Sequence, residues 1–276
     1  MWGSPERGEG ARLPAEQLVA LHQAYPAKEI AEGRHDVGPA DVDADAFVRD
    51  AVIGDGWLHP QSSNYTFVVQ LTCDGRSGYG VYKPERGAAP LWDFPGGTLY
   101  RRECAMYELA RALDWGLVPP TVAREGEVGV GSLQLFVPSP ADVNFFTMRD
   151  SHRDEMFRMA VLDVIANNAD RKGGHCLADA EGRVWGVDHG LTFHTERKLR
   201  TVIWDFMGLD VPEGLLVGLR GLQDQVCAED SVEAGRIAEF LSAPEMDALR
   251  GRLRGLIERP VMPQPFSRRD VPWPWI

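Results

Sequence analysis

The sequence predicts an α+β protein of two lobes, with a sheet-rich part first and a mainly helical part after it. Apolar and polar residues alternate in two runs between residues 65 and 83, around a turn rich in Asp, Gly and Ser, which predicts a β-hairpin. Apolar residues instead recur at helical spacing after Ser151 and after Ser242, where Ser-Ala-Pro-Glu has the form of a capping box. This change of period along the chain predicts the two lobes.

Proline residues and polar stretches suggest the domain boundaries. Residues 1–45 are predicted to be an N-terminal extension, with a mobile Gly-, Arg- and Glu-rich start and a short helix over residues 14–25. Residues 46–138 are predicted to form the sheet-rich lobe and residues 139–276 the helical lobe. The boundary is drawn at Pro138-Ser139-Pro140, because prolines interrupt regular backbone hydrogen bonding.

A lysine near the end of the second strand is the first residue that indicates chemistry. Tyr79, Val81 and Lys83 share one face of that strand, which predicts that the lysine points toward the apolar core. An unpaired ammonium group is costly to bury, so Lys83 would need an anionic partner. The alternative is a lysine at a strand end whose stem packs on the protein and whose ammonium group reaches water.

A helix downstream offers two possible partners. Thr98 can cap a helix over residues 99–115, and Gly116 follows in the position that commonly ends helices. Glu103 and Glu108 lie in this helix, and helical position alone does not decide which of them reaches the lysine. If one of them pairs with it, the carboxylate would hold the ammonium group in place.

The most informative stretch is a loop followed by a short hairpin. Asp170 lies in the loop Asn-Asn-Ala-Asp-Arg, His175 follows five positions on, and Asp188 comes just after a hairpin that turns at residues 181 and 182. Folding about that turn is predicted to set His175 opposite Asp188. Taken alone, the Asp-Arg loop and the Asp-His-Gly turn are each more often solvated surface structure. Together with the upstream lysine, they form the layout that metal-assisted phosphoryl transfer requires.

Composition narrows the function further. The net charge of −12 over 276 residues argues against binding to nucleic acids or to anionic membranes, because both need a basic face. No apolar run has the length of a membrane span, so we expect no integral membrane association. The four cysteines lack a Cys-x-x-Cys spacing, which favours reduced thiols and a cytoplasmic protein. The apolar end, residues 271–276, is expected to dock on the body of the protein or on a partner protein.

Several short motifs occur in the order found in a known family. They resemble the phosphoinositide 3/4-kinase-like branch of the kinase superfamily, and within it an actinobacterial group of unassigned substrate that is related to HipA-type and secretory-pathway kinases. The similarity covers roughly residues 50–210. The motifs are Tyr82-Lys83-Pro84, Arg102-Glu103, Gly-Leu-Val-Pro-Pro-Thr at 116–121, Asn-Asn-Ala-Asp-Arg at 167–171 and Val-Asp-His-Gly at 187–190.

The resemblance implies a protein-kinase-like fold that uses ATP and Mg²⁺ or Mn²⁺ to move the γ-phosphoryl group to a hydroxyl acceptor. Lys83 would bind phosphate and Glu103 would be its helix partner, while Asp170 would orient or deprotonate the acceptor. Asp188 would hold the metal. His175 stands where most kinases carry Asn, and its imidazole would be either a metal ligand or an ordinary strand-end side chain.

The resemblance also implies where the nucleotide binds. A repeated-glycine loop is missing, so Ser62 and Ser63 would contact the phosphates together with nearby backbone N–H groups. The strand over residues 131–138 leads into the position of the kinase hinge, where backbone groups of Gln134 and Phe136 would face the adenine.

Two other functions remain open from the sequence. A kinase-like fold that holds ATP in the opposite sense would donate AMP, and a pseudokinase would bind nucleotide and serve as a scaffold. The acceptor would be a protein, a peptide or a small molecule that carries a hydroxyl group.

Overall fold

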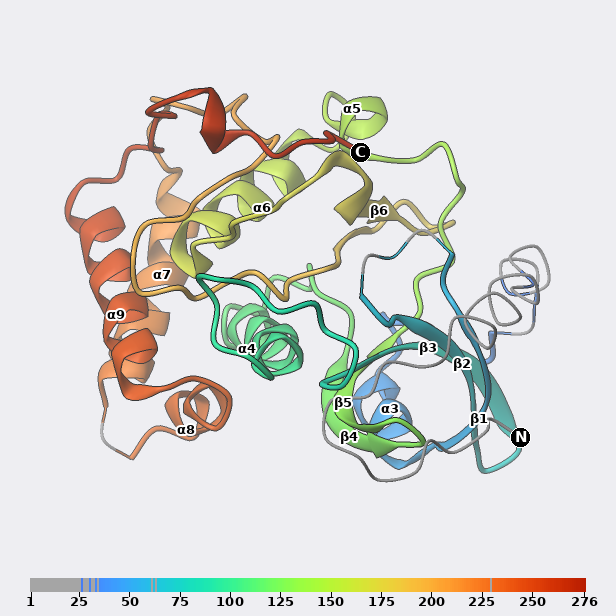
Figure 1. The fold of residues 1–276 in the computed structure, drawn as a ribbon. Helices are drawn as coiled ribbons and strands as arrows, with labels where there is room; N and C mark the ends of the chain where they lie inside the picture. The colour runs from blue at the N-terminus through green and yellow to red at the C-terminus, as the bar shows by residue number, and fades with distance from the viewer. Residues whose placement is uncertain are drawn as a thin grey trace. The chain divides into compact units, whose positions relative to one another are not determined.

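A computed structural model describes residues 26, 30, 33, 35–60, 62, 64–228 and 230–276. The helix predicted over residues 14–25 and the side chain of Ser63 therefore lie outside the described residues. The chain divides into two compact units (Figure 1). The first contains the described residues up to Cys104 together with Pro119–Pro138, and the second contains Ala105–Val118 together with Ser139–Ile276.

The first unit is built on a five-stranded antiparallel sheet. Its order is β1-β2-β3-β5-β4, and helix α3 (Ala44–Asp50) contributes the buried Phe47 and Val48 to its core. The strands are β1 (Val52–Leu58), β2 (Phe67–Cys73), β3 (Arg76–Pro84), β4 (Thr121–Gly126) and β5 (Gly129–Leu135). The predicted hairpin is β2 and β3, and its turn is shorter than the sequence pattern indicated. Only Asp74 and Gly75 lie between the paired Cys73 and Arg76. Both have positive φ angles, of 50° and 76°, as tight hairpin turns require.

The faces of β3 differ from the prediction. Tyr79, Val81 and Lys83 do share a face, but that face is half-buried, and the opposite face lies against the core. The core-facing positions include Gly78 and Gly80. A Cβ atom at Gly80 would lie 2.7 Å from Leu133 Cδ1 and 3.0 Å from Leu71 Cδ1, so the neighbouring leucines fill the space that a side chain would take. The prediction was wrong because glycines hide an inner face from a search for apolar residues.

The second unit is mainly helical and carries a two-stranded sheet. Helix α6 buries Met156, Met159, Leu162 and Ile165 in its core, and α7 and α9 run side by side (Figure 1). The elements are α5 (Phe145–Met148), α6 (Arg153–Ala166), β6 (Cys176–Ala178), β7 (Val184–Gly186), α7 (Glu213–Cys227), α8 (Val232–Ala238), α9 (Ala243–Glu258) and the 3₁₀ turns Gly173–His175 and Arg268–Asp270. The α+β class, with a sheet-rich part and a mainly helical part, is confirmed.

Helix ends agree with the sequence in one case and differ in two. Ser242 and Glu245 form the predicted capping box at the start of α9. Ser151 does not cap α6, because its hydroxyl group donates to the carbonyl of Met148 at 3.0 Å and the helix begins at Arg153. Helix α4 (Leu99–Ala112) ends earlier than predicted, and Asp114 follows it in the left-handed region with φ of 53°. Within the described residues no helix has the length and apolarity needed to cross a membrane.

Close backbone contact between β3 and β5 generates a first prediction. A Cβ atom at Gly131 would lie 2.5 Å from the carbonyl oxygen of Lys83 and 2.7 Å from Pro84 Cα, so Gly131→Ala must push the two strands apart. We expect it to lower the free energy of unfolding of the first unit by about 1–3 kcal/mol, the usual cost of overpacking. Urea denaturation followed by tryptophan fluorescence measures this change.

The matched control is Gly54→Ala in β1, where the nearest atom, Gln70 Cβ, lies at 3.6 Å. This is an ordinary van der Waals distance, so the control should unfold close to the wild-type midpoint. Equal stability of the two variants would contradict the proposed close approach.

Candidate active site

In the first unit, Lys83 pairs with Glu103. The lysine Nζ lies 2.5 Å from Glu103 Oε1. Glu108 is instead occupied by Arg111 one turn further along, with Arg111 Nη2 at 2.5 Å from its Oε2. The choice that the sequence left open between the two glutamates is therefore decided in favour of Glu103.

The burial of this pair shows what each member can do. The Glu103 side chain is 4% exposed and the Lys83 side chain is 23% exposed. A buried carboxylate needs a charged partner, so the ammonium group stabilises Glu103 and is held in one place by it. The ammonium group carries three donors, and the Lys83 side chain is only partly buried, which suits it to bind an anion as well.

In the second unit, a fully buried ion pair organises the loop that carries Asp170. Arg171 Nη2 lies 2.9 Å from Asp163 Oδ1, and both side chains are 0% exposed. The same guanidinium group donates to the carbonyls of His175 at 3.3 Å and Val187 at 3.0 Å. Although burial alone would lower the pKa of Arg171, Asp163 raises it above the ordinary value. One arginine thus joins helix α6, the loop and both sides of the β6–β7 hairpin.

Two asparagines complete this framework. Asn167 ends α6 in the left-handed conformation with φ of 56°, and its side chain donates to the carbonyls of His194 and Glu196. Asn168 Nδ2 donates to Asp163 Oδ1 at 2.9 Å, and its Oδ1 accepts from the Asp170 N–H at 3.0 Å. The backbone at Asp170 is therefore fixed by residues that are themselves buried.

The Asp170 carboxylate is partly buried and lies beside a positive charge. Its Oδ2 is 3.2 Å from Lys172 Nζ, and its side chain is 26% exposed. Burial raises the pKa of Asp170 above its ordinary value, Lys172 opposes that rise, and the Asp188 carboxylate adds to it. A raised pKa improves a carboxylate as a proton acceptor, because the proton is taken up more readily. Sequence reasoning missed Lys172, whose spacing two positions after Asp170 was the available signal.

The predicted approach of His175 to Asp188 is present. His175 Nε2 lies 3.3 Å from Asp188 Oδ2, and the Asp188 side chain is 52% exposed. In the backbone, however, His175 is opposite Val187, whose N–H donates to the His175 carbonyl at 2.9 Å. The hairpin register is therefore one residue from the predicted one. The left-handed backbone of Asp188, with φ of 59°, accompanies this arrangement.

His175 and Asp188 are the residues that would hold a divalent ion. No group of three or more His, Cys, Asp or Glu side chains with metal-site geometry occurs among the described residues. Mg²⁺ in phosphoryl-transfer sites is usually held by one or two carboxylates, with the remaining positions filled by phosphate oxygens and water. A set of two protein groups, one of them half exposed, fits that pattern.

The predicted nucleotide contacts are placed as follows. The Ser62 hydroxyl group lies 3.3 Å from His59 Nδ1. The Gln134 side chain donates to Thr121 Oγ1 at 2.8 Å inside the sheet, and Gln134 is paired with Val81 of β3 and with Thr121 of β4. The Phe136 N–H donates to the Tyr79 carbonyl at 2.9 Å, which leaves the Phe136 carbonyl for the predicted role. Adenine contact by these residues stays a prediction.

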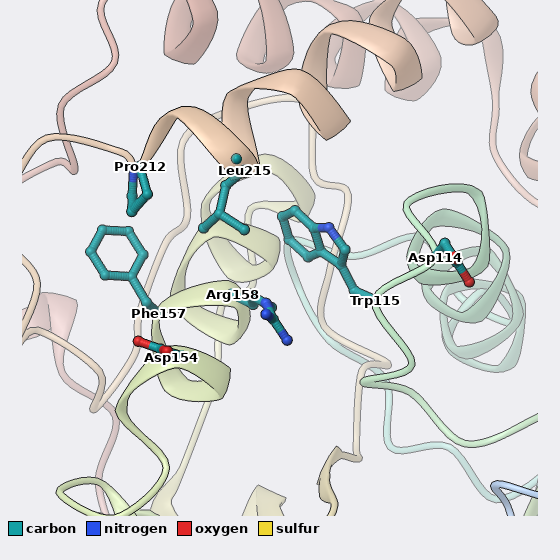
Figure 2. A pocket seen from close by; sticks show the side chains of 8 residues that line it. Asp114, Trp115, Asp154, Phe157, Arg158, Pro212 and Leu215 are labelled. Atoms are coloured by element: carbon teal, nitrogen blue, oxygen red, sulfur yellow. The ribbon is translucent and has the colours of Figure 1, made fainter.

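A separate cavity lies in the second unit (Figure 2). Its volume is about 520 Å³, and Trp115, Phe157 and Leu215 give it apolar walls, with the Arg158 side chain between them. None of the predicted site residues lines it. The lining residues are Asp114, Trp115, Asp154, Phe157, Arg158, Pro212, Gly214 and Leu215.

Comparisons with known proteins show a similar mycobacterial protein and a similar bacterial kinase structure. The chain is 40% identical over 265 residues to Protein Rv2133c of Mycobacterium tuberculosis, covering 81% of this chain and 94% of that protein. No family model matches the chain. The crystal structure of a proinflammatory kinase of Helicobacter pylori, CtkA, is similar with a TM-score of 0.46 and 12% identity, over 77% of this chain and 94% of that chain.

The buried pair generates a second prediction. Asp163→Asn leaves the Arg171 charge buried without its carboxylate, so we expect the free energy of unfolding of the second unit to fall by about 3–5 kcal/mol. Denaturant unfolding measures this loss. The control is Asp205→Asn, which removes a partly exposed pair with Arg149, at 3.2 Å, and should cost at most about 1 kcal/mol. Similar losses in both variants would show that Asp163 has no special role.

Proposed function

The chain belongs to the family of Protein Rv2133c, and we propose that it is an ATP-dependent phosphotransferase that moves the γ-phosphoryl group to a hydroxyl acceptor. The observation that carries this proposal is the Lys83–Glu103 pair at 2.5 Å. The pair joins residues twenty positions apart, and the Lys83 side chain stays partly exposed. The same arrangement of lysine and helix glutamate orients the nucleotide phosphates in protein kinases.

The second unit supplies the groups for the transfer step. The acceptor hydroxyl group would donate its proton toward Asp170 as its oxygen attacks the γ-phosphorus and the bond to ADP breaks. The Asp170 carboxylate orients that hydroxyl group, and the Lys172 ammonium at 3.2 Å keeps the carboxylate in place. Lys172 also brings positive charge to a region where charge on the phosphoryl oxygens must be neutralised.

Metal binding is assigned to His175 and Asp188 on the basis of their 3.3 Å approach. A divalent ion bound there with ATP would neutralise phosphate charge. The imidazole in place of an amide favours Mn²⁺ as an alternative to Mg²⁺, because Mn²⁺ accepts nitrogen ligands more readily. The resemblance of the motifs to those of phosphoinositide 3/4-kinase-like proteins supports an active site of this type. It does not identify the acceptor.

The location of the reaction is proposed from thiol chemistry. Among the described residues, Cys73, Cys104, Cys176 and Cys227 are thiols that form no disulfide bond. Burial raises the pKa of Cys176 to about 12, so this thiol is unreactive at neutral pH. Free thiols suit a reducing compartment, and we therefore propose a cytoplasmic protein.

Labelled nucleotide tests the function directly. Incubation of the purified protein and cell extract with γ-labelled ATP should transfer label to an acceptor, whereas α-labelled ATP should not. Transfer from α-labelled ATP alone would indicate AMP donation, and binding without transfer would indicate a pseudokinase. Mass analysis of the labelled product identifies the acceptor.

Substitutions tie the activity to the named residues. Lys83→Met and Asp188→Asn should each reduce γ-transfer by about 10² or more, because the first removes a positive charge from the phosphates and the second removes the carboxylate that would hold the metal ion. The control is Asp247→Asn on the exposed surface of α9, whose side chain is 74% exposed. Ordinary γ-transfer by Lys83→Met or Asp188→Asn would refute the kinase proposal.

Asp170 should serve transfer at the expense of stability. Because burial raises its pKa in the folded state, ionisation of Asp170 disfavours folding as the pH rises above the ordinary value of 3.8. Asp170→Asn should therefore keep or slightly raise the melting temperature at pH 7, and this difference should vanish below pH 4, where the wild-type carboxyl group is protonated. Transfer should fall by about 10² or more with ATP affinity retained. Calorimetry and rate measurements report both effects, and a lower melting temperature with an unchanged rate would make Asp170 a structural residue.

A further inference from the structure

The C-terminal segment, residues 271–276, lies against the loop that joins Asp170 to His175. The N–H of Gly173 donates to the Trp275 carbonyl at 2.6 Å. A Cβ atom at Gly173 would lie 3.2 Å from that carbonyl oxygen and 2.7 Å from the Phe146 ring of α5, so this glycine is enclosed between them. Figure 1 shows the C-terminus beside α5. The backbone of this loop is therefore fixed by a segment about a hundred residues away in sequence.

Asp270, the residue just before this segment, is hydrogen-bonded to residues of the second unit, one of which itself contacts the loop. The Asp270 carbonyl accepts from the Thr201 N–H at 3.0 Å and from Trp204 Nε1 at 3.2 Å. Thr201 also forms a parallel β-bridge with Arg171. The Asp270 carboxylate holds Arg197 at 3.2 Å. Trp275 therefore contacts this loop directly, at Gly173, and Asp270 is linked to it through Thr201, which pairs with Arg171.

The attachment is made by the backbone more than by the side chains. Trp273, Trp275 and Ile276 are 77%, 54% and 66% exposed, so their removal uncovers little core. Pro272, just before them, is buried. A segment that adds little buried apolar surface contributes little to global stability by the hydrophobic effect. Its hydrogen bond to Gly173 must act mainly on the local geometry of the loop.

We propose that the C-terminal segment is a positioning element of the metal-binding loop, with the Trp275 carbonyl as the positioning group. By holding Gly173, it fixes the turn Gly173–His175 and hence the place of the His175 imidazole beside Asp188. This inference rests on the metal role proposed for His175 and Asp188. It assigns to the end of the chain a part in metal binding that its sequence does not suggest.

The test compares the full chain with a chain that ends at Pro272, using Mn²⁺ without nucleotide as the probe. Loss of the segment should weaken Mn²⁺ binding, followed by electron paramagnetic resonance, by about tenfold or more, the usual effect of losing a group that orients a metal ligand. Hydrogen exchange at the Gly173 amide should become about tenfold faster or more, while α9 keeps its protection and so reports an intact fold.

Two further substitutions sharpen the comparison. Trp273→Ala, in the full chain, removes the more exposed of the two indoles in the segment but keeps the Trp275 carbonyl, so Mn²⁺ affinity and Gly173 exchange should stay at the wild-type values. Gly173→Ala should resemble the shortened chain, because its methyl group would lie 2.7 Å from the Phe146 ring and 3.2 Å from the Trp275 carbonyl oxygen, so the loop and the segment cannot keep their contact unchanged. Gly174→Ala should have a much smaller effect, since its Cβ would meet only Ile276 Cγ2, at 3.6 Å.

The outcomes separate this inference from the proposed function. Unchanged Gly173 exchange and unchanged Mn²⁺ affinity in the shortened chain would overturn the positioning role. A loss in Trp273→Ala equal to that of the shortened chain would also overturn it, because the indole would then be responsible. If the full chain binds no Mn²⁺, the metal role of His175 and Asp188 fails, and the exchange measurement still decides whether the segment holds the loop.

Discussion

The buried pair of Asp163 and Arg171 is the interaction on which the geometry of the candidate site in the second unit depends. Both side chains are 0% exposed, so their charged groups lose all contact with water. Only close contact between them and a complete set of hydrogen bonds compensate for that loss. The guanidinium group meets this requirement with five donors in a fixed plane. It donates to Asp163, to two backbone carbonyls, and to His189 Nε2 at 2.7 Å. Because these bonds reach α6, the turn at His175 and the stretch after β7, the pair sets the relative positions of Asp170, His175 and Asp188.

The fold was largely predictable because its signals are local. Alternation in β2 and the capping box at Ser242 depend on neighbours within one element. The capping box is present, and Phe67, Val69 and Leu71 are buried as predicted, although Val68 on the other face of β2 is buried as well. The face of β3 was misjudged for a physical reason. Glycines at positions 78 and 80 carry no side chain, so the core there is made by residues from other elements. The pattern of apolar residues within one strand cannot show that side chains from other elements fill the core at these positions.

The sequence indicated the members of the candidate site, whose roles stay predictions, but it did not indicate the framework that holds them. Lys83, Asp170, His175 and Asp188 stand out because ionisable groups occur at unusual places in the sequence. The choice of Glu103 over Glu108 depends on the rotation of α4 and on Arg111, and neither is fixed by spacing. Asp163 lies within the apolar run of α6, where a single acid is easily taken for a surface residue. A charge inside an otherwise buried helix is the signal that was available.

The glycines of the first unit have a consequence for large-scale mutagenesis. A Cβ atom at Gly80 would lie 2.7 Å from Leu133 Cδ1, and one at Gly126 would lie 2.8 Å from Tyr82 Cζ. In a screen that selects for activity, both positions would tolerate almost no replacement and would score like residues that contact substrate. Packing and chemistry would then be indistinguishable in the resulting map. A parallel selection for protein abundance separates them, since losses at these glycines would appear in both screens and losses at reactive groups in only one.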